Sequence, residues 1–300
     1  MSGASRADAE TIEVLAPAKV NLWLHLLGRR PDGYHLIDSL VVFAEIGDSL
    51  VVTPADELTL EVDGPFARAL PKESDNLVLR AARLLAEAGC VAPQARLRLT
   101  KRLPVAAGIG GGSADAAATF RALDRLWRLG LDGSSLQKLA LELGADVPVC
   151  LAGEPCHVGG IGEILTPAPR LPAVHAVLVN AGVALDTARV FAARAGEFLP
   201  DPFTGRRPDP PADATALAAW LAGWRNDLTE AAASLSPAIG ETLAILADQP
   251  GCLLSRMSGS GATCFGLFAD EADAVAAAAA IEERRPHWWV SKTRLRGSKH

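Results

Sequence analysis

The chain has 300 residues, which is enough for two domains or one large domain, each with its own core. Hydrophobic residues make up 49% and charged residues 21%, as in ordinary globular proteins, and the formal net charge is -6 at pH 7. A protein that binds duplex nucleic acid normally has a basic face, so this charge argues against such a partner. It leaves room for a local basic pocket that binds an anionic substrate.

The N-terminal segment and the cysteines indicate a reducing, aqueous location. The first ten residues are polar, and the apolar runs are far shorter than the ~20 residues that a membrane helix needs. The five cysteines form no C-x-x-C pair, so we expect reduced and mostly buried thiols. We predict a cytoplasmic protein, and no zinc-type pattern indicates a metal held by protein ligands alone.

The first half of the chain has the pattern of an α+β domain. Apolar residues at even positions predict a strand over 12–28, which we expect Pro17 to break near residues 16–18. A Pro-Asp-Gly turn follows, and strand material at 39–52 is expected to break at Gly47 and Asp48. Further strands are predicted at 58–62 and 95–100, and helices at 76–89, 114–129 and 134–143.

The second half begins where prolines cluster, near residues 163–172. We therefore expect an N-terminal domain over 1–165 and a C-terminal domain over 166–300. Strands are predicted at 173–180, 252–257, 262–268 and 287–295, and helices at 214–224, 237–247 and 270–284. This order favours a small α+β sandwich, and the Pro-rich residues 200–214 are predicted to form a surface loop.

A glycine-rich stretch runs from Pro104 to Asp115 and carries the strongest local signal for chemistry. Glycine takes positive φ and lets the backbone approach an anion, and the helix that follows offers unpaired N–H groups and a positive dipole end. The stretch therefore favours phosphate binding through Pro104, Gly108, Gly110, Gly111, Gly112, Ser113 and Ala114.

Other interpretations of this stretch are weaker. A Walker A loop needs a lysine before the hydroxyl residue, and a Rossmann fingerprint needs glycine where Ser113 stands. A flexible turn with no ligand is the plain structural alternative.

Three further stretches are informative mainly in combination. Lys19 lies within an apolar strand, where a lysine needs a carboxylate or an anion unless it reaches the surface from an edge. Asp146 lies between a helix end and an expected apolar strand at 147–149, and by itself it could be an ordinary turn residue. Residues 257–263, Met-Ser-Gly-Ser-Gly-Ala-Thr, could close over a nucleotide or form a simple β-turn.

Taken together, these stretches resemble the three motifs of the GHMP kinases, a superfamily that includes galactokinase, homoserine kinase and mevalonate kinase. Ala-Pro-Ala-Lys-Val-Asn, the glycine-rich stretch and Met-Ser-Gly-Ser-Gly-Ala occur in the family's order, over about residues 12–268. Residues 28–35, 144–148 and 225–228 narrow the resemblance to the branch that acts in non-mevalonate isoprenoid precursor biosynthesis. Kinases of that branch phosphorylate the 2-hydroxyl of a cytidine diphosphate-linked sugar alcohol.

The resemblance implies a fold and a set of site residues. The N-terminal domain is expected to be like the second domain of ribosomal protein S5, and the C-terminal domain to be ferredoxin-like. ATP and Mg²⁺ are expected at the glycine-rich stretch, Lys19 and Asp146 match the catalytic pair, and the cytidine diphosphate substrate is the expected small-molecule partner. Matching substrate-side residues are Asn21, Tyr34, His35, Thr187 and Phe191.

Some residues depart from the family pattern. Ala114 stands where many relatives have a second serine, so one hydroxyl that could serve Mg²⁺ is missing. Ala181 and Asp186 replace proline and serine in the substrate-side loop, and Asp186 adds a negative charge.

The chemistry expected of this family is phosphoryl transfer, in which positioning and charge stabilisation supply most of the rate. Asp146 would accept or orient the proton of the attacking hydroxyl, while Lys19 would keep Asp146 ionised and stabilise the transferring group. Alternatives are another GHMP-type small-molecule kinase and a non-catalytic nucleotide or metabolite sensor on the same scaffold. A dehydrogenase is the least favoured of the alternatives.

Overall fold

The structure is a computed structural model that describes residues 11–70, 76–198 and 211–298. Two compact units are present, and each is assembled from separate stretches of the chain. The first contains residues 1–17, 47–105 and 111–152, and the second contains residues 18–46, 106–110 and 153–300. The expected domain boundary between residues 165 and 166 stays a prediction. None of the described helices is long and apolar enough to cross a lipid bilayer.

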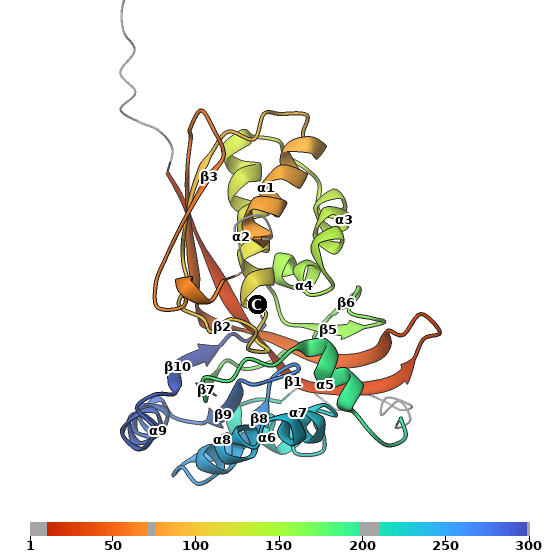
Figure 1. The fold of residues 1–300 in the computed structure, drawn as a ribbon. Helices are drawn as coiled ribbons and strands as arrows, with labels where there is room; N and C mark the ends of the chain where they lie inside the picture. The colour runs from red at the N-terminus through yellow and green to blue at the C-terminus, as the bar shows by residue number, and fades with distance from the viewer. Residues whose placement is uncertain (1–10, 71–75, 199–210, 299–300) are drawn as a thin grey trace, which may run out of the picture. The chain divides into compact units, whose positions relative to one another are not determined.

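The first unit combines a small sheet with four helices (Figure 1). Strand β4 (Arg96–Thr100) pairs antiparallel with the end of β2 (His35–Thr53) and parallel with β3 (Thr59–Asp63). Leu97 and Leu99 are buried while Arg96 and Arg98 are exposed, as the alternating sequence predicts. The helices are α1 (Leu77–Ala88), α2 (Gly111–Trp127), α3 (Gly133–Leu143) and α4 (Val147–Ala152), and a 3₁₀ turn covers Ala67–Ala69.

Sequence-encoded caps set several of these helix ends. The Asn76 side chain accepts a hydrogen bond from the N–H of Val78 at the start of α1, and Asp132 does the same for Ser135 in α3. Gly89 and Gly144 are the C-terminal caps of the same two helices.

The second unit contains a sheet in the order β2-β10-β7-β9-β8. Its strands are β7 (Val174–Asn180), β8 (Cys252–Met257), β9 (Cys264–Phe268) and β10 (Trp289–Leu295). Together with α8 (Ala238–Ala247) and α9 (Glu271–Arg284) they follow the order β-α-β-β-α-β, which is that of the ferredoxin-like fold. The C-terminal expectation is therefore confirmed in topology.

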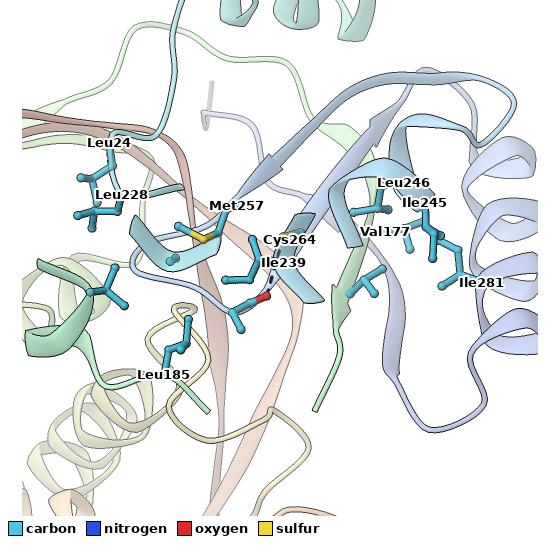
Figure 2. Packing of buried hydrophobic residues seen from close by; sticks show 14 of the residues in the cluster. Leu24, Val177, Leu185, Leu228, Ile239, Ile245, Leu246, Met257, Cys264 and Ile281 are labelled. Atoms are coloured by element: carbon cyan, nitrogen blue, oxygen red, sulfur yellow. Dashed lines mark hydrogen bonds between the residues drawn. The ribbon is translucent and has the colours of Figure 1, made fainter. Parts of the chain in front are cut away.

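Apolar side chains from the sheet and helices of the second unit form one core (Figure 2). Val177 and Cys264 contribute from β7 and β9, while Ile245 and Leu246 come from α8 and Ile281 from α9. The remaining elements of this unit are β1 (Ile12–Arg29, in part), β5 (Cys156–Gly159), β6 (Ile164–Pro167), α5 (Thr187–Ala193), α6 (Ala214–Leu221) and α7 (Thr229–Leu235).

Two predicted strand breaks are wrong. Strand β1 continues through Pro17, and β2 continues through Gly47 and Asp48. A Cβ atom on Gly47 would lie 2.2 Å from the Ala16 carbonyl oxygen and 2.8 Å from the Pro17 Cα. Glycine is therefore needed because two backbones approach closely there, and it does not end the strand.

Two further predictions fail near the glycine-rich stretch. The helix expected from residue 114 begins at Gly111, and the apolar residues after Asp146 form α4 instead of a strand. Pro148 lies in the first turn of α4, where the N–H that proline lacks would have no helical partner. Helices α5 and α7 and strands β5 and β6 had not been predicted. Residues 200–210 of the expected Pro-rich loop lie outside the described residues.

We expect Gly47→Ala to destabilise the protein by ~1–3 kcal/mol, because an added methyl group overlaps backbone atoms that cannot move independently. Gly133→Ala is the matched control, since a Cβ there meets nothing within 4 Å. Urea unfolding monitored by circular dichroism measures both. Equal stability of the two variants would contradict the close-approach explanation.

Candidate functional site

Three predicted motifs meet within the second unit. The main-chain N–H of Lys19 donates to the carbonyl of Ile109 in the glycine-rich stretch at 2.9 Å. The hydroxyl of Ser258 accepts from the N–H of Asn21 at 3.1 Å and donates to the carbonyl of Gly108 at 3.0 Å. Strand β1, residues 106–110 and the loop after β8 are thus connected directly.

Lys19 and Asn21 point into a buried polar network. Lys19 is only 4% exposed, and its ammonium donates to the Asn21 side-chain oxygen at 3.0 Å. The Asn21 amide donates to the Ser39 hydroxyl at 2.8 Å, and Ser39 donates to the carbonyl of Trp23. Lysine is seldom fully buried unless it has polar partners, so this network, and not a snorkelling surface position, accounts for Lys19.

Glycine is needed at positions 108 and 259 because both residues have positive φ and because neither position has room for a Cβ atom. Gly108 has φ of 72°, and a Cβ there would lie 2.5 Å from the Ser258 carbonyl oxygen. Gly259 has φ of 54°, and its Cβ would lie 2.6 Å from the Gly108 carbonyl oxygen. The glycine-rich stretch and the loop after β8 therefore approach each other through bare backbone.

Residues 104–105 and 111–115 of the glycine-rich stretch belong to the first unit, whereas Gly110 belongs to the second. Gly110 still has positive φ, at 65°, whereas Gly111 and Gly112 are the first residues of α2 and do not. Ser113 is half-buried in the first turn of α2, and Ala114 is buried. Pro104, also buried, precedes the turn region. The stretch thus combines a glycine turn with a helix start, which is the arrangement that binds phosphate groups.

Asp146 is exposed immediately before α4. Its carbonyl accepts from the N–H of Cys150, and Arg121 of α2 donates to the carbonyls of Cys150 and Leu151 at 3.1 and 3.2 Å. Helix α4 is therefore fixed to α2, which also carries Ser113. Asp146 and Ser113 lie in one unit, and Lys19 and Asn21 lie in the other.

The predicted cytosine residues His35 and Phe191 are brought together in the second unit. Their ring centroids are 5.1 Å apart with planes inclined by 39°. Tyr34, which is 59% exposed, precedes His35. Burial, together with the positive charges of Arg29 and Arg194, lowers the pKa of His35 below 6.5. His35 is therefore neutral at pH 7, with one ring nitrogen that donates and one that accepts.

Two residues near His35 were missed by the sequence analysis. The ring centroid of Phe198 lies 6.0 Å from that of His35, and the guanidinium of Arg194 lies 4.4 Å above the Phe198 ring. Neither residue belongs to a recognisable motif. Only the aromatic type of Phe198 and the positive charge of Arg194, both suited to a nucleotide, could have indicated them.

Thr187 and Asp186 occupy the start of α5. The Thr187 hydroxyl lies 2.9 Å from that of Ser260, which connects α5 to the loop after β8. The Asp186 carboxylate accepts from the N–H of Arg189 at 2.8 Å and so caps α5. The unusual charge at position 186 therefore has a local structural role.

Asn226 and Asp227 hold main-chain segments of the site in place through hydrogen bonds. In the sequence they were recognised only as part of the family resemblance. The Asn226 amide donates to the carbonyls of Met257 and Gly259 at 2.9 and 2.8 Å. The Asp227 carboxylate accepts from the N–H of Leu26 at 2.8 Å. The Asn226 bonds span 31 and 33 residues of sequence and the Asp227 bond spans 201, so no local pattern could have predicted them.

The chain could hold Mg²⁺ with few protein ligands. No group of three His, Cys, Asp or Glu residues that could hold a metal exists in the described ranges. Mg²⁺ in kinases is bound mainly by substrate phosphates and water, with one or two protein oxygens, so this composition fits. Ser113 and Asp146 are the oxygen-bearing side chains of the predicted site in the first unit.

Comparison with known proteins identifies the family. The family profile described as GHMP kinases N terminal domain matches residues 76–154, and that described as GHMP kinases C terminal matches residues 212–287. The 4-diphosphocytidyl-2-C-methyl-D-erythritol kinase of Paramagnetospirillum magneticum is 56% identical over 286 residues, which cover 95% of this chain and 99% of that protein. The chain belongs to this kinase family.

Other relatives agree with the family assignment. The 4-diphosphocytidyl-2-C-methyl-D-erythritol kinase of Rhodospirillum rubrum is 53% identical, covering 96% of this chain and 94% of that one. A crystal structure of 4-(cytidine 5'-diphospho)-2C-methyl-D-erythritol kinase matches with a TM-score of 0.76 and 36% identity, over 96% of this chain and 100% of that chain. Homoserine kinase from Cytophaga hutchinsonii shares the fold alone, with a TM-score of 0.70 and 19% identity.

The expected GHMP kinase family and α+β fold are therefore confirmed, including the narrower branch indicated by residues 28–35, 144–148 and 225–228. The individual roles of the site residues stay predictions, because family membership does not test them. The five cysteines are free thiols, and Cys150, Cys156 and Cys264 are buried.

Proposed function

We propose that this protein transfers the γ-phosphoryl group of ATP to the 2-hydroxyl of 4-diphosphocytidyl-2-C-methyl-D-erythritol. The observation that carries the proposal is the 53–56% identity to kinases of that name over at least 94% of each protein. The polar network around Lys19 and the meeting of three motifs at Ser258 support it, because both are built from the residues that the family pattern selects. We further infer a cytoplasmic location, as the free thiols favour.

The glycine-rich stretch would bind the ATP phosphates. Backbone N–H groups at the start of α2 can donate to phosphate oxygens, and the positive end of the helix dipole favours negative charge there. Mg²⁺, when bound with the nucleotide, would neutralise charge on the phosphates, and the Ser113 hydroxyl could assist it.

Lys19 and Asp146 would act on the reacting groups. Asp146 accepts or orients the proton of the attacking hydroxyl, and its exposed position lets a substrate reach it. Lys19 contributes a compact positive charge to the transferring phosphoryl group, and Asn21 holds its ammonium in place. A loose phosphoryl-transfer transition state depends on such positioning more than on covalent help from the protein.

The cytidine would be recognised in the second unit. The neutral imidazole of His35 can both donate to and accept from the edge of cytosine, while Tyr34 and Phe191 supply aromatic faces for stacking. Thr187, which follows the Asp186 cap of α5, would contribute to the substrate side of the site.

A different GHMP-type kinase would share the nucleotide site and lack the cytosine recognition. A non-catalytic sensor would bind ATP without transfer. ADP release in the presence of Mg-ATP and a panel of alcohols, with and without the cytidylyl group, separates the three. Turnover only with the cytidine diphosphate alcohol supports the proposal.

We expect Lys19→Met and Asp146→Asn to fold normally and to lose turnover by ~10²–10⁴-fold, because each removes a charge-stabilising or proton-accepting group. Circular dichroism verifies the fold, and a coupled ADP assay measures kcat. Asp132→Asn, which alters only an exposed cap of α3, is the control and should keep its activity. A folded variant of Lys19 or Asp146 with near-normal kcat would show that its assigned role is wrong.

Tyr34→Ala should reduce kcat/KM for the cytidine diphosphate substrate ~5- to 150-fold, since stacking of an aromatic side chain on a base contributes ~1–3 kcal/mol. The KM for ATP should hardly change. Methylerythritol phosphate, which lacks the cytidylyl group, should be a very poor substrate of the wild type. Equal turnover with and without that group would rule out cytosine recognition and leave a generic GHMP-type kinase.

A further inference from the structure

Two arginine side chains beside the predicted cytosine residues have no role in the function proposed so far. Arg29 is the last residue of β1, and Arg194 directly follows α5. Both belong to the second unit, as does His35. Burial lowers the pKa of His35, and the positive charges of the two arginines lower it further. The whole chain has a net charge of -6, so these cations form a local basic region in an acidic protein.

No carboxylate accounts for these two charges. In the described part of the chain, neither Arg29 nor Arg194 forms an ion pair with an acidic side chain. Arg30, which lies next to Arg29, instead pairs with Asp32 at 2.7 Å and is locally neutralised. An arginine without an acidic partner can bind an anionic ligand without first giving up an ion pair.

Aromatic rings place the Arg194 guanidinium in the region of His35. The guanidinium lies 4.4 Å above the centre of the Phe198 ring, in a cation–π contact. The Phe198 ring centroid is 6.0 Å from that of His35, and the Phe191 centroid is 5.1 Å from it. An arginine that stacks by its flat face keeps its N–H groups, which lie in the plane of the guanidinium, directed outward from its edge.

Main-chain acceptors fix the orientation of this guanidinium before any ligand binds. It donates to the carbonyl oxygens of Gly196 and Glu197. A guanidinium has five N–H donors, so these two bonds leave three for a ligand as far as the described residues are concerned. Since the Arg194 side chain is already held, little conformational entropy is lost when it binds a phosphate.

Arg29 contributes a second charge and also supports the turn before Tyr34. Its Nε atom donates to the carbonyl of Gly33 at 3.2 Å, which closes the Pro-Asp-Gly turn. A change of Arg29 would therefore alter the position of Tyr34 together with the local charge. The side-chain hydrogen bonds of Arg194 go to residues 196 and 197 instead, so its charge can be removed without touching the turn.

The combination of rings and cations indicates which part of a ligand binds here. Aromatic rings and a neutral imidazole suit a base, which has flat faces and a hydrogen-bonding edge. A guanidinium matches the oxygens of a phosphate group, to which it can donate two parallel hydrogen bonds. A nucleoside phosphate offers both groups one sugar apart, whereas an unphosphorylated nucleoside gives Arg194 no anion to bind.

We propose that Arg194 is a substrate-binding residue that donates hydrogen bonds to a phosphate group of the cytidine diphosphate substrate. Through this contact it selects phosphorylated cytidine compounds over cytidine itself, while His35 and the rings around it hold the base. The inference deepens the proposed function and rests on it, because it assumes that the cytosine binds beside His35.

The test measures the binding of cytidine, cytidine monophosphate and cytidine diphosphate to wild type, Arg194→Gln and Arg189→Gln. Titration calorimetry gives Kd for the two nucleotides, and ligand-observed NMR gives Kd for the weaker cytidine. Glutamine keeps a long side chain that can donate to the carbonyls of Gly196 and Glu197 but has no charge. Arg189 is the matched control, because it is an exposed arginine of α5 whose charge is not among those that lower the pKa of His35.

We expect wild type to bind the diphosphate at least ~10-fold more tightly than cytidine, since hydrogen bonds to charged groups are among the stronger ones. Arg194→Gln should raise Kd for the diphosphate ~10- to 30-fold and change Kd for cytidine less than ~2-fold. Arg194→Lys should recover part of the loss, because it restores the charge without the fork of donors. Arg189→Gln should match wild type for all three compounds, and Kd for a non-hydrolysable ATP analogue should be the same in every variant.

Several results would overturn the inference. Wild type that binds cytidine as tightly as the diphosphate does so whether or not the variants fold, and so does Arg194→Gln with wild-type affinity for the diphosphate. An equal loss of affinity for cytidine and for the diphosphate in Arg194→Gln would show that Arg194 only shapes the base site. An equal loss in Arg189→Gln and Arg194→Gln would show that any positive charge on this helix has the effect.

A failure of the inference can be told apart from a failure of the proposed function. If the diphosphate binds with the expected dependence on Arg194 but no alcohol is phosphorylated, the proposed function fails while the inference stands. If the protein phosphorylates the cytidine diphosphate alcohol and Arg194→Gln has the wild-type KM for it, the inference fails while the proposed function stands.

Discussion

The hydroxyl group of Ser258 connects segments that are more than 200 residues apart in the sequence. It accepts a hydrogen bond from the main chain of Asn21 and donates one to the carbonyl of Gly108, and Ser258 itself is fully buried. Each motif alone is an ordinary strand, turn or loop. The shared hydroxyl makes them one structure, since a buried donor or acceptor left without a partner costs ~1–3 kcal/mol.

This connection depends on support from residues that never touch a substrate. Asn226 fixes the backbone on both sides of Ser258 through Met257 and Gly259. Arg256, buried in the same unit, donates to the carbonyls of Leu22, Leu221 and Trp224. Burial lowers the pKa of Arg256 to about 10, yet it remains a cation at neutral pH and needs these acceptors. Strand β1 and the loop after β8 are thus held in place by hydrogen bonds from buried polar side chains.

The sequence predicted the elements with clear periodicity and failed where tertiary contacts decide. Alternation of apolar residues predicted β4, and helical spacing of apolar residues predicted α1. Gly47 was wrongly predicted as a break because glycine can mark a close approach of two backbones as well as a turn, and only the fold distinguishes them. Val147–Ala152 is apolar with a β-branched start, so its short helix is set by packing on α2 and α3.

For the site, the motifs and the family were recognisable from the sequence, but the residues that hold the motifs in place were not. Lys19, the glycine-rich stretch and residues 257–263 were recognisable because they are local. Arg194 and Phe198 near His35 were not, and neither was the buried ion-pair cluster of Asp48, Lys101 and Asp115. Lys101 and Asp48 are 53 residues apart, and nothing in either neighbourhood shows that they bond. Long-range ion pairs follow from the fold.

The most direct test of the account is the affinity of Ser258→Ala for a non-hydrolysable ATP analogue, measured by titration calorimetry. Ser234→Ala is the matched control, because that hydroxyl donates locally, to the carbonyl of Ala231 three residues earlier. We expect Ser258→Ala to bind the analogue ~10-fold more weakly, since the loss of ~1.4 kcal/mol corresponds to one decade in Kd. Nucleotide affinity equal to that of Ser234→Ala would contradict the claim that this hydroxyl unites the three motifs into one nucleotide site.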